Sequence, residues 1–86
     1  MKTCLVVDDS PVIRHMARRI LEASDWRVEE ASDGQQALAA CDAEMPDLVL
    51  LDWRMPVMNG MECLMRLRGR PGGAGPRVIF CSVETA

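Results

Sequence analysis

The stretch that decides the fold runs Asp47-Leu48-Val49-Leu50-Leu51-Asp52 and continues as Trp53-Arg54-Met55-Pro56-Val57-Met58-Asn59-Gly60. A short, continuous apolar run between turn signals is typical of a strand buried on both faces of a parallel sheet. Pro56 and Gly60 are breakers, so we expect a loop over residues 53–60. The run therefore predicts a central strand that carries Asp52 at its carboxyl end.

Three further strands and three helices are expected around this one. The strands are Leu5–Val7, Trp26–Ala31 and Val78–Cys81. The second of them is more polar, with two adjacent glutamates, which favours an edge position. Apolar residues at helical spacing predict helices over residues 11 to about 24, from the Ser32-Asp33-Gly34 turn to just before Met45, and over Met61–Leu67. The alternation of strands and helices predicts an α/β protein with parallel strands and right-handed crossovers.

Polar residues follow the apolar strands. Asp8 and Asp9 end the first, Asp52 ends the third along the chain, and Ser82 ends the last. In open parallel sheets, ligands bind beyond the carboxyl ends of the strands. Carboxylates gathered there repel one another, and a hard divalent cation, Mg²⁺ or alternatively Mn²⁺, relieves the repulsion. The plainer alternative is that Asp8 and Asp9 only end a strand and cap the first helix.

Length and composition bound the class of protein. The 86 residues make one small domain, and 49% hydrophobic with 27% charged residues is ordinary for a globular chain. The formal net charge of -3 argues against a nucleic-acid surface, and no apolar run approaches the roughly 20 residues of a membrane span. Because the N-terminus does not read as a signal peptide, we expect a cytoplasmic location and four cysteines that stay thiols.

Three segments in order resemble the receiver domain of two-component response regulators. They are Val6-Val7-Asp8-Asp9-Ser10-Pro11, the Pro46–Gly60 stretch with its Asp-x-x-Met-Pro-x-Met-Asn-Gly pattern, and Val78-Ile79-Phe80-Cys81-Ser82. The resemblance implies a flavodoxin-like, doubly wound parallel sheet with four strands in the order 2-1-3-4 and three helices. Residues 1–86 would then form one N-terminal part of a receiver domain, with the fifth strand and the last helices missing.

The resemblance also implies a mechanism in phosphorelay signalling. Asp52 would accept a phosphoryl group from a phosphohistidine on a histidine kinase or a histidine phosphotransfer protein. Asp9, Asp52 and the backbone carbonyl of Arg54 would bind Mg²⁺ directly, and Asp8 would act through a metal-bound water. Ser82 would donate its hydroxyl to a phosphoryl oxygen after transfer and draw the following loop inward.

The chain departs from the family pattern beyond its fourth strand. A complete receiver has a lysine and an aromatic switch residue on a fifth strand, whereas the only lysine here, Lys2, is expected at the end of the sheet opposite Asp52. We therefore expect phosphorylation that is slow or poorly coupled to output. Strand 78–81 would be an open edge beside bare apolar surface, which predicts a two-fold homodimer through that edge or that face.

Two other functions compete with a phosphoacceptor module. The first is a receiver-like interaction or dimerisation fragment that carries no phosphate. The second is a metal-dependent phosphohydrolase with an aspartyl nucleophile, but that chemistry usually needs an acid two residues after the nucleophile, and position 54 is Arg54. We therefore expect a signalling module and not an enzyme.

Overall fold

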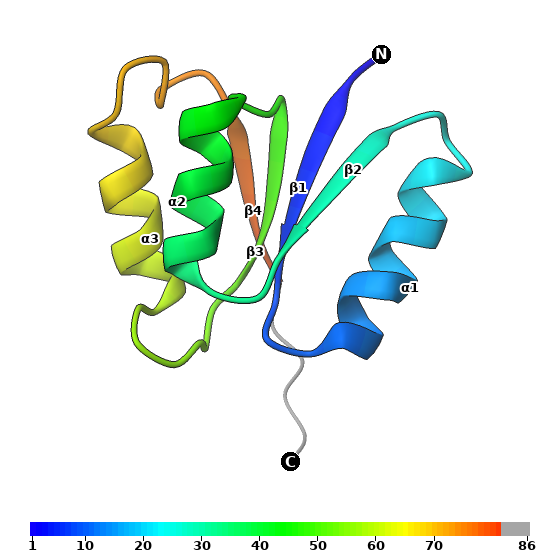
Figure 1. The fold of residues 1–86 in the computed structure, drawn as a ribbon, viewed down its shortest axis with the longest axis horizontal. Helices are drawn as coiled ribbons and strands as arrows, with labels where there is room; N and C mark the ends of the chain where they lie inside the picture. Colours follow the sequence, from blue (N-terminus) through cyan, green and yellow to red (C-terminus); the bar gives the residue numbers. More distant parts are fainter. Residues whose placement is uncertain (82–86) are drawn as a thin grey trace.

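A computed structural model describes residues 1–81, in which strands and helices alternate along the chain (Figure 1). The elements are β1 (Thr3–Val7), α1 (Pro11–Glu22), β2 (Arg27–Ala31), α2 (Gly34–Ala43), β3 (Leu48–Asp52), α3 (Gly60–Arg68) and β4 (Arg77–Cys81). The sheet of the described residues has the order β2-β1-β3-β4, and every neighbouring pair is parallel. The predicted fold class and strand order are therefore confirmed.

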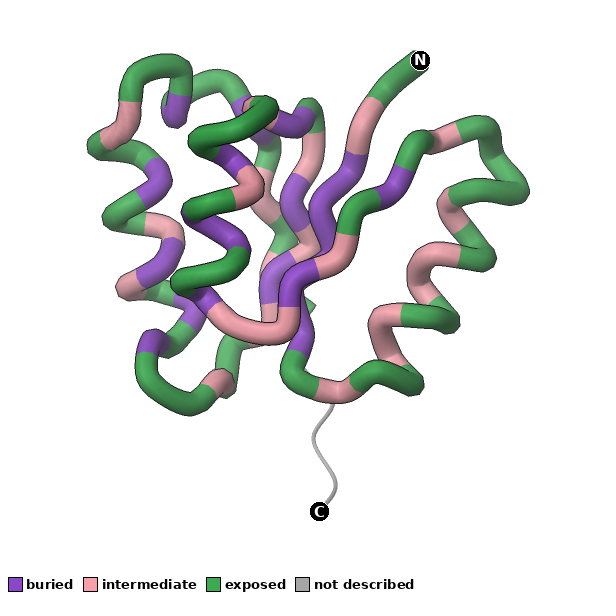
Figure 2. The backbone as a smooth tube through the Cα atoms, in the orientation of Figure 1, coloured by how far each residue is buried: buried purple, intermediate pink, exposed green. Residues whose placement is uncertain are grey.

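The helices form layers on both faces of this sheet. Helices α2 and α3 pack side by side over one face, whereas α1 packs against β1 and β2 on the other (Figure 1). Alternate residues of β1 supply the two cores: Leu5 and Val7 belong to the larger one with α2 and α3, and Cys4 and Val6 belong to the smaller one under α1. Burial on both faces explains why β1 reads as a continuous apolar run (Figure 2).

Part of the α1 side of the sheet is bare in the described residues, as expected. Leu48 and Leu50 of β3 are only partly buried there, and Ile79 of β4 is 51% exposed. Helix α1 also carries a row of exposed apolar side chains, spaced four residues apart. They are Val12, Met16 and Ile20.

The ends of the elements differ from prediction by one or two residues. Helix α1 ends at Glu22 and not near residue 24, because the chain turns at Asp25, which has a φ of 65°. Aspartate tolerates this left-handed conformation better than most residues. The turn leaves Trp26 before β2, with its N–H donating to the Leu21 carbonyl at 3.1 Å. No helix within residues 1–81 has the length and apolarity that crossing a membrane requires.

Candidate functional site

Three predicted site residues meet at one end of the sheet. Asp8 and Asp9 directly follow β1, and Asp52 is the last residue of β3. Each offers a carboxylate oxygen, and these oxygens all lie within 4.8 Å of one another. The convergence follows from the register, because Val7 of β1 is level with Leu51 of β3 and the two parallel strands end together.

A tight turn lets Asp8 and Asp9 serve the same site although they are adjacent in sequence. Asp8 is 7% exposed, and its N–H donates to the Ala31 carbonyl at 3.1 Å, which extends the pairing with β2. Its Oδ1 accepts a hydrogen bond from the Ser10 N–H at 2.8 Å. The Ser10 hydroxyl in turn accepts from the Ile13 N–H at 3.3 Å and caps α1. The chain thus passes from β1 to α1 in only three residues.

Backbone hydrogen bonds hold the loop after β3 at both of its ends. The Arg54 N–H donates to Oδ1 of Asp52 at 3.2 Å, and the Trp53 N–H donates to the Cys81 carbonyl of β4 at 3.3 Å. At the far end of the loop, the Gly60 N–H donates to the Trp53 carbonyl at 3.1 Å. A Cβ on Gly60 would lie 2.6 Å from the Asp52 carbonyl oxygen. Glycine is therefore what allows α3 to begin this close to the site.

Beside the carboxylates lies a shallow, open depression. Its lining residues are Asp9, Trp53, Arg54, Met55, Pro56 and Asn59. The Trp53 ring is 43% exposed and meets the Phe80 ring edge-on, with a centroid distance of 4.9 Å. Trp53 is thus fixed near the site, and it offers an intrinsic fluorescent probe of binding there.

Burial and mutual repulsion both disfavour the charged form of Asp8 in this cluster. Burial raises the pKa of Asp8; the Ser10 N–H opposes the shift, and the charges of Asp52 and Asp9 add to it. Mg²⁺ takes oxygen ligands at about 2.0–2.1 Å, so oxygens on opposite sides of the ion are roughly 4.2 Å apart. The carboxylate set spans up to 4.8 Å, slightly wider than that separation. The three side chains therefore offer the oxygen ligands that a hard divalent cation prefers, at a spacing near the one that direct binding requires.

Two predicted site residues are not tested by this geometry. Arg54 lines the depression, but the ligand role of its backbone carbonyl stays a prediction. Ser82 lies outside the described residues, and its switch role stays a prediction as well.

The sequence did not single out Arg14 or Glu30 as part of the site. In the sequence Arg14 is one of several charged residues of the first helix, yet its Nη1 donates to the Asp8 carbonyl oxygen at 2.7 Å. Its Nε donates to Oε1 of Glu30, at the end of β2, at 3.1 Å. The spacing in the sequence could have indicated this contact, because Arg14 lies one helical turn after the Ser10 cap and therefore faces the end of β1.

Comparison with known proteins gives one family. The sequence model for the response regulator receiver domain matches residues 4–86. A curated relative is the positive alginate biosynthesis regulatory protein of Pseudomonas aeruginosa, which is 44% identical over 83 residues, 93% of this chain and 33% of that protein. The chain spans about a third of the length of this and another curated regulator that it matches.

Solved structures give the same result. Chemotaxis protein CheY4 of Vibrio cholerae superposes with a TM-score of 0.93 at 34% identity, covering 100% of this chain and 72% of that one. Response regulator TrrA of Thermotoga maritima, solved in complex with Mg(2+)-BeF, superposes with a TM-score of 0.89 at 30% identity. That match covers 99% of this chain and 72% of the TrrA chain.

Proposed function

Because this chain belongs to the family of response regulator receiver domains, we propose that it acts in two-component signal transduction by accepting a phosphoryl group on Asp52. The observation that carries the proposal is the meeting of Asp8, Asp9 and Asp52 within 4.8 Å at the ends of two neighbouring strands. The fully buried Leu51 anchors the end of β3 that carries the acceptor carboxylate, and the adjoining carboxylates supply the charge that a divalent cation needs.

The acceptor chemistry is an in-line displacement at phosphorus. One oxygen of Asp52 is oriented by the Arg54 N–H. A carboxylate oxygen of Asp52 attacks the phosphorus, the O–P bond forms, and the N–P bond to the donor histidine breaks, so that the histidine leaves with the electron pair. The product is an acyl phosphate on Asp52. We propose that Ser82 then donates its hydroxyl to a phosphoryl oxygen and couples the chemistry to a change of shape.

The proposed metal ligands are those that the resemblance to receiver domains implies. We propose that Asp9, Asp52 and the Arg54 carbonyl hold Mg²⁺, or Mn²⁺ in its place, and that Asp8 acts through a bound water. When bound, the ion supplies charge neutralisation for the transferring phosphoryl group. Support for the assignment comes from the burial of Asp8 and the exposure of Asp9, because the exposed carboxylate borders the open depression.

The partner that fits this site is a phosphohistidine on another protein. The depression that Asp9 and Trp53 line is open, so a donor side chain on a partner's surface has room to approach. We propose a histidine kinase or a histidine phosphotransfer protein as this donor.

A cytoplasmic location accords with the four cysteines, all of which are free thiols.

A second copy of the chain is the other partner that we propose. In the described residues β4 pairs only with β3, so the outer edge of β4 carries unpaired N–H and C=O groups. The neighbouring apolar surface includes Ile79, which is 51% exposed. We expect light scattering to give about twice the 9.5 kDa mass of one chain. A mass of one chain at high concentration would contradict the dimer.

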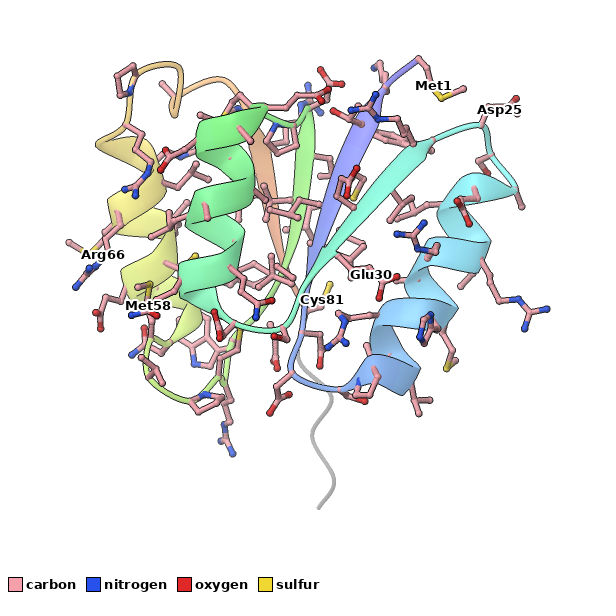
Figure 3. All side chains as sticks on the ribbon, viewed as in Figure 1. Met1, Asp25, Glu30, Met58, Arg66 and Cys81 are labelled. Carbon is pink, nitrogen blue, oxygen red and sulfur yellow. The ribbon has the colours of Figure 1, made fainter. Side chains whose placement is uncertain are left out.

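Phosphorylation by a small donor tests the main proposal. With acetyl phosphate and Mg²⁺, we expect a mass gain of one phosphoryl group that hydroxylamine removes, as it removes acyl phosphates. Asp52→Asn should abolish the gain, and chelation of the metal should prevent it. Asp25→Asn is the matched control, because Asp25 is an exposed aspartate in the turn after α1, far from the site (Figure 3).

The same experiment separates the competing functions. A wild-type chain that binds Mg²⁺ but gains no phosphoryl group would favour the interaction fragment that carries no phosphate. Calorimetric titration with Mg²⁺ tests the metal site by itself, and identical heats for the wild type and Asp52→Asn would contradict it.

A further inference from the structure

One charged side chain outside the carboxylate cluster is tied directly to its backbone. Arg14 of α1 donates from Nη1 to the Asp8 carbonyl at 2.7 Å and from Nε to Glu30 at 3.1 Å. The side chains of Arg14 and Glu30 are each only 17% exposed. The guanidinium therefore bridges the turn after β1 and the end of β2, and it does so away from bulk water.

Glu30 is a firm anchor for this bridge. It also accepts from Nε of Arg18 at 2.7 Å, and Arg18 is itself 3.4 Å from Glu22 on the same helix. Partial burial acts to raise the pKa of Glu30, but the hydrogen bond and charge of Arg18, the charge of His15 and the hydrogen bond of Arg14 outweigh it and lower that pKa. Glu30 is thus held as a carboxylate that points toward α1 (Figure 3).

The atom that Arg14 holds belongs to the peptide unit between Asp8 and Asp9. The same planar unit carries the Asp8 carbonyl and the Asp9 N–H, so fixing the carbonyl fixes the direction in which the chain enters Asp9. The Ser10 N–H holds the Asp8 carboxylate on the other side of the turn. Asp9 itself is exposed, so its aim depends on the backbone that carries it.

We propose that Arg14 is a positioning residue of the metal site, which fixes the Asp8–Asp9 peptide against Glu30 so that the Asp9 carboxylate faces Asp52. The inference rests on the proposed function, because it assumes that this cluster binds a divalent cation. Removing a partner that orients metal ligands typically weakens metal binding about 10- to 100-fold. Arg14 would act through hydrogen bonds and not through its charge.

The loss of Arg14 should change the affinity for Mg²⁺ in opposite directions, depending on whether Arg14 acts through its charge or by positioning Asp9. A guanidinium beside the site repels a divalent cation, so its charge alone weakens metal binding. If only charge mattered, Arg14→Met would tighten the binding of Mg²⁺. If Arg14 holds the peptide, the same substitution loosens binding despite the lost repulsion.

The experiment compares Mg²⁺ affinity, by calorimetry, and Mn²⁺ affinity, by quenching of Trp53 fluorescence, across matched variants. We expect Arg14→Met to raise the dissociation constant about tenfold. Arg14→Lys, which keeps the charge and can still donate one hydrogen bond, should recover part of the loss. Arg19→Gln removes an equal charge from an exposed position on the same helix and should change the dissociation constant less than twofold, at about the noise of the assay.

Different results would contradict the metal site and the positioning role of Arg14. A wild-type chain that binds neither ion would contradict the metal site itself. Wild-type binding together with equal or tighter binding by Arg14→Met, or no recovery in Arg14→Lys, would overturn the role of Arg14 alone. Thermal unfolding without metal checks that the variants fold. We expect them to fold, because Arg18 still donates a hydrogen bond to Glu30 when Arg14 is replaced. Should Arg14→Met not fold, Arg14→Gln makes the same comparison with a polar side chain.

Discussion

Asp52 ends β3 and Asp8 directly follows the neighbouring parallel strand β1, which brings their carboxylate oxygens within 4.8 Å of each other. One of the two side chains is buried, and both are carboxylates, so their negative charges repel each other. Repulsion between them therefore acts against folding as long as no cation is bound. The chain keeps a locally unfavourable arrangement at the place where a ligand would make it favourable.

Stability without metal should rise when one of these charges is removed. Because the pKa of Asp8 is raised in the folded state, the folded chain binds the proton more tightly than the unfolded chain does. The free energy of unfolding then falls as the pH rises above the usual aspartate value of 3.8. Asp8→Asn keeps the acceptor for the Ser10 N–H, so we expect it to stabilise the metal-free protein at pH 7 by about 1 kcal/mol. Urea unfolding measures this, and Asp25→Asn should give no comparable gain.

Gly60 should not tolerate a side chain. Its Cβ would lie 2.6 Å from the Asp52 carbonyl oxygen and 3.0 Å from the Phe80 ring, and neither backbone nor packed ring can easily retreat. We expect Gly60→Ala to lower the free energy of unfolding by about 1–3 kcal/mol, the usual cost of overpacking, and to weaken metal binding. In the matched control Gly69→Ala, the nearest atom would be 3.6 Å away. If Gly60→Ala and Gly69→Ala lowered the free energy of unfolding by the same amount, the close approach of Gly60 to the Asp52 carbonyl would be contradicted.

Val57 is held in a left-handed conformation that disfavours its branched side chain. Its φ is 71° and its side chain is 81% exposed, so removing that side chain sacrifices little burial. We expect Val57→Gly to stabilise the protein by about 0.5–1 kcal/mol, because relief of the strain exceeds the entropic cost of glycine. Denaturant unfolding tests this against Val57→Ala, which keeps a Cβ. If alanine stabilised as much as glycine, backbone strain would not be the cause.

Thiol labelling should report the charge state of the site. Cys81 is exposed, whereas burial raises the pKa of Cys4 and Cys41 to about 11, so Cys81 should react first with a thiol reagent. Desolvation, and then the charges of Asp8 and Asp52, raise the pKa of Cys81 as well. Mg²⁺ that neutralises those carboxylates should lower this pKa and speed the labelling several-fold near pH 8, since the thiolate is the reactive form.

Two variants check the labelling experiment. Cys81→Ser should remove the fast phase, and Asp52→Asn should remove its dependence on Mg²⁺. A fast phase that survives in Cys81→Ser would mean that another thiol is accessible.

The central strands and the carboxylates were predictable, because a strand buried on both faces reads as a continuous apolar run in the sequence. Leu48–Leu51 and Leu5–Val7 are continuous apolar runs, and each is followed at once by aspartate. Parallel pairing then allows one outcome, with the aspartates at a common edge. The ends of the helices were less predictable, since the left-handed turn at Asp25 depends on one backbone angle that the apolar pattern does not encode.

By itself, then, the sequence determined the order of the elements, the parallel sheet and the set of acidic residues, because periodicity and strand termination are local properties of the chain. Only the tertiary structure decided what holds those acids in place. Arg14 reads as one more charge on a helix until α1 packs against β1 and β2 and brings its guanidinium to the Asp8 carbonyl and to Glu30. That contact joins three elements, and its geometry is set by how the helix packs on the sheet, which no stretch of residues specifies alone.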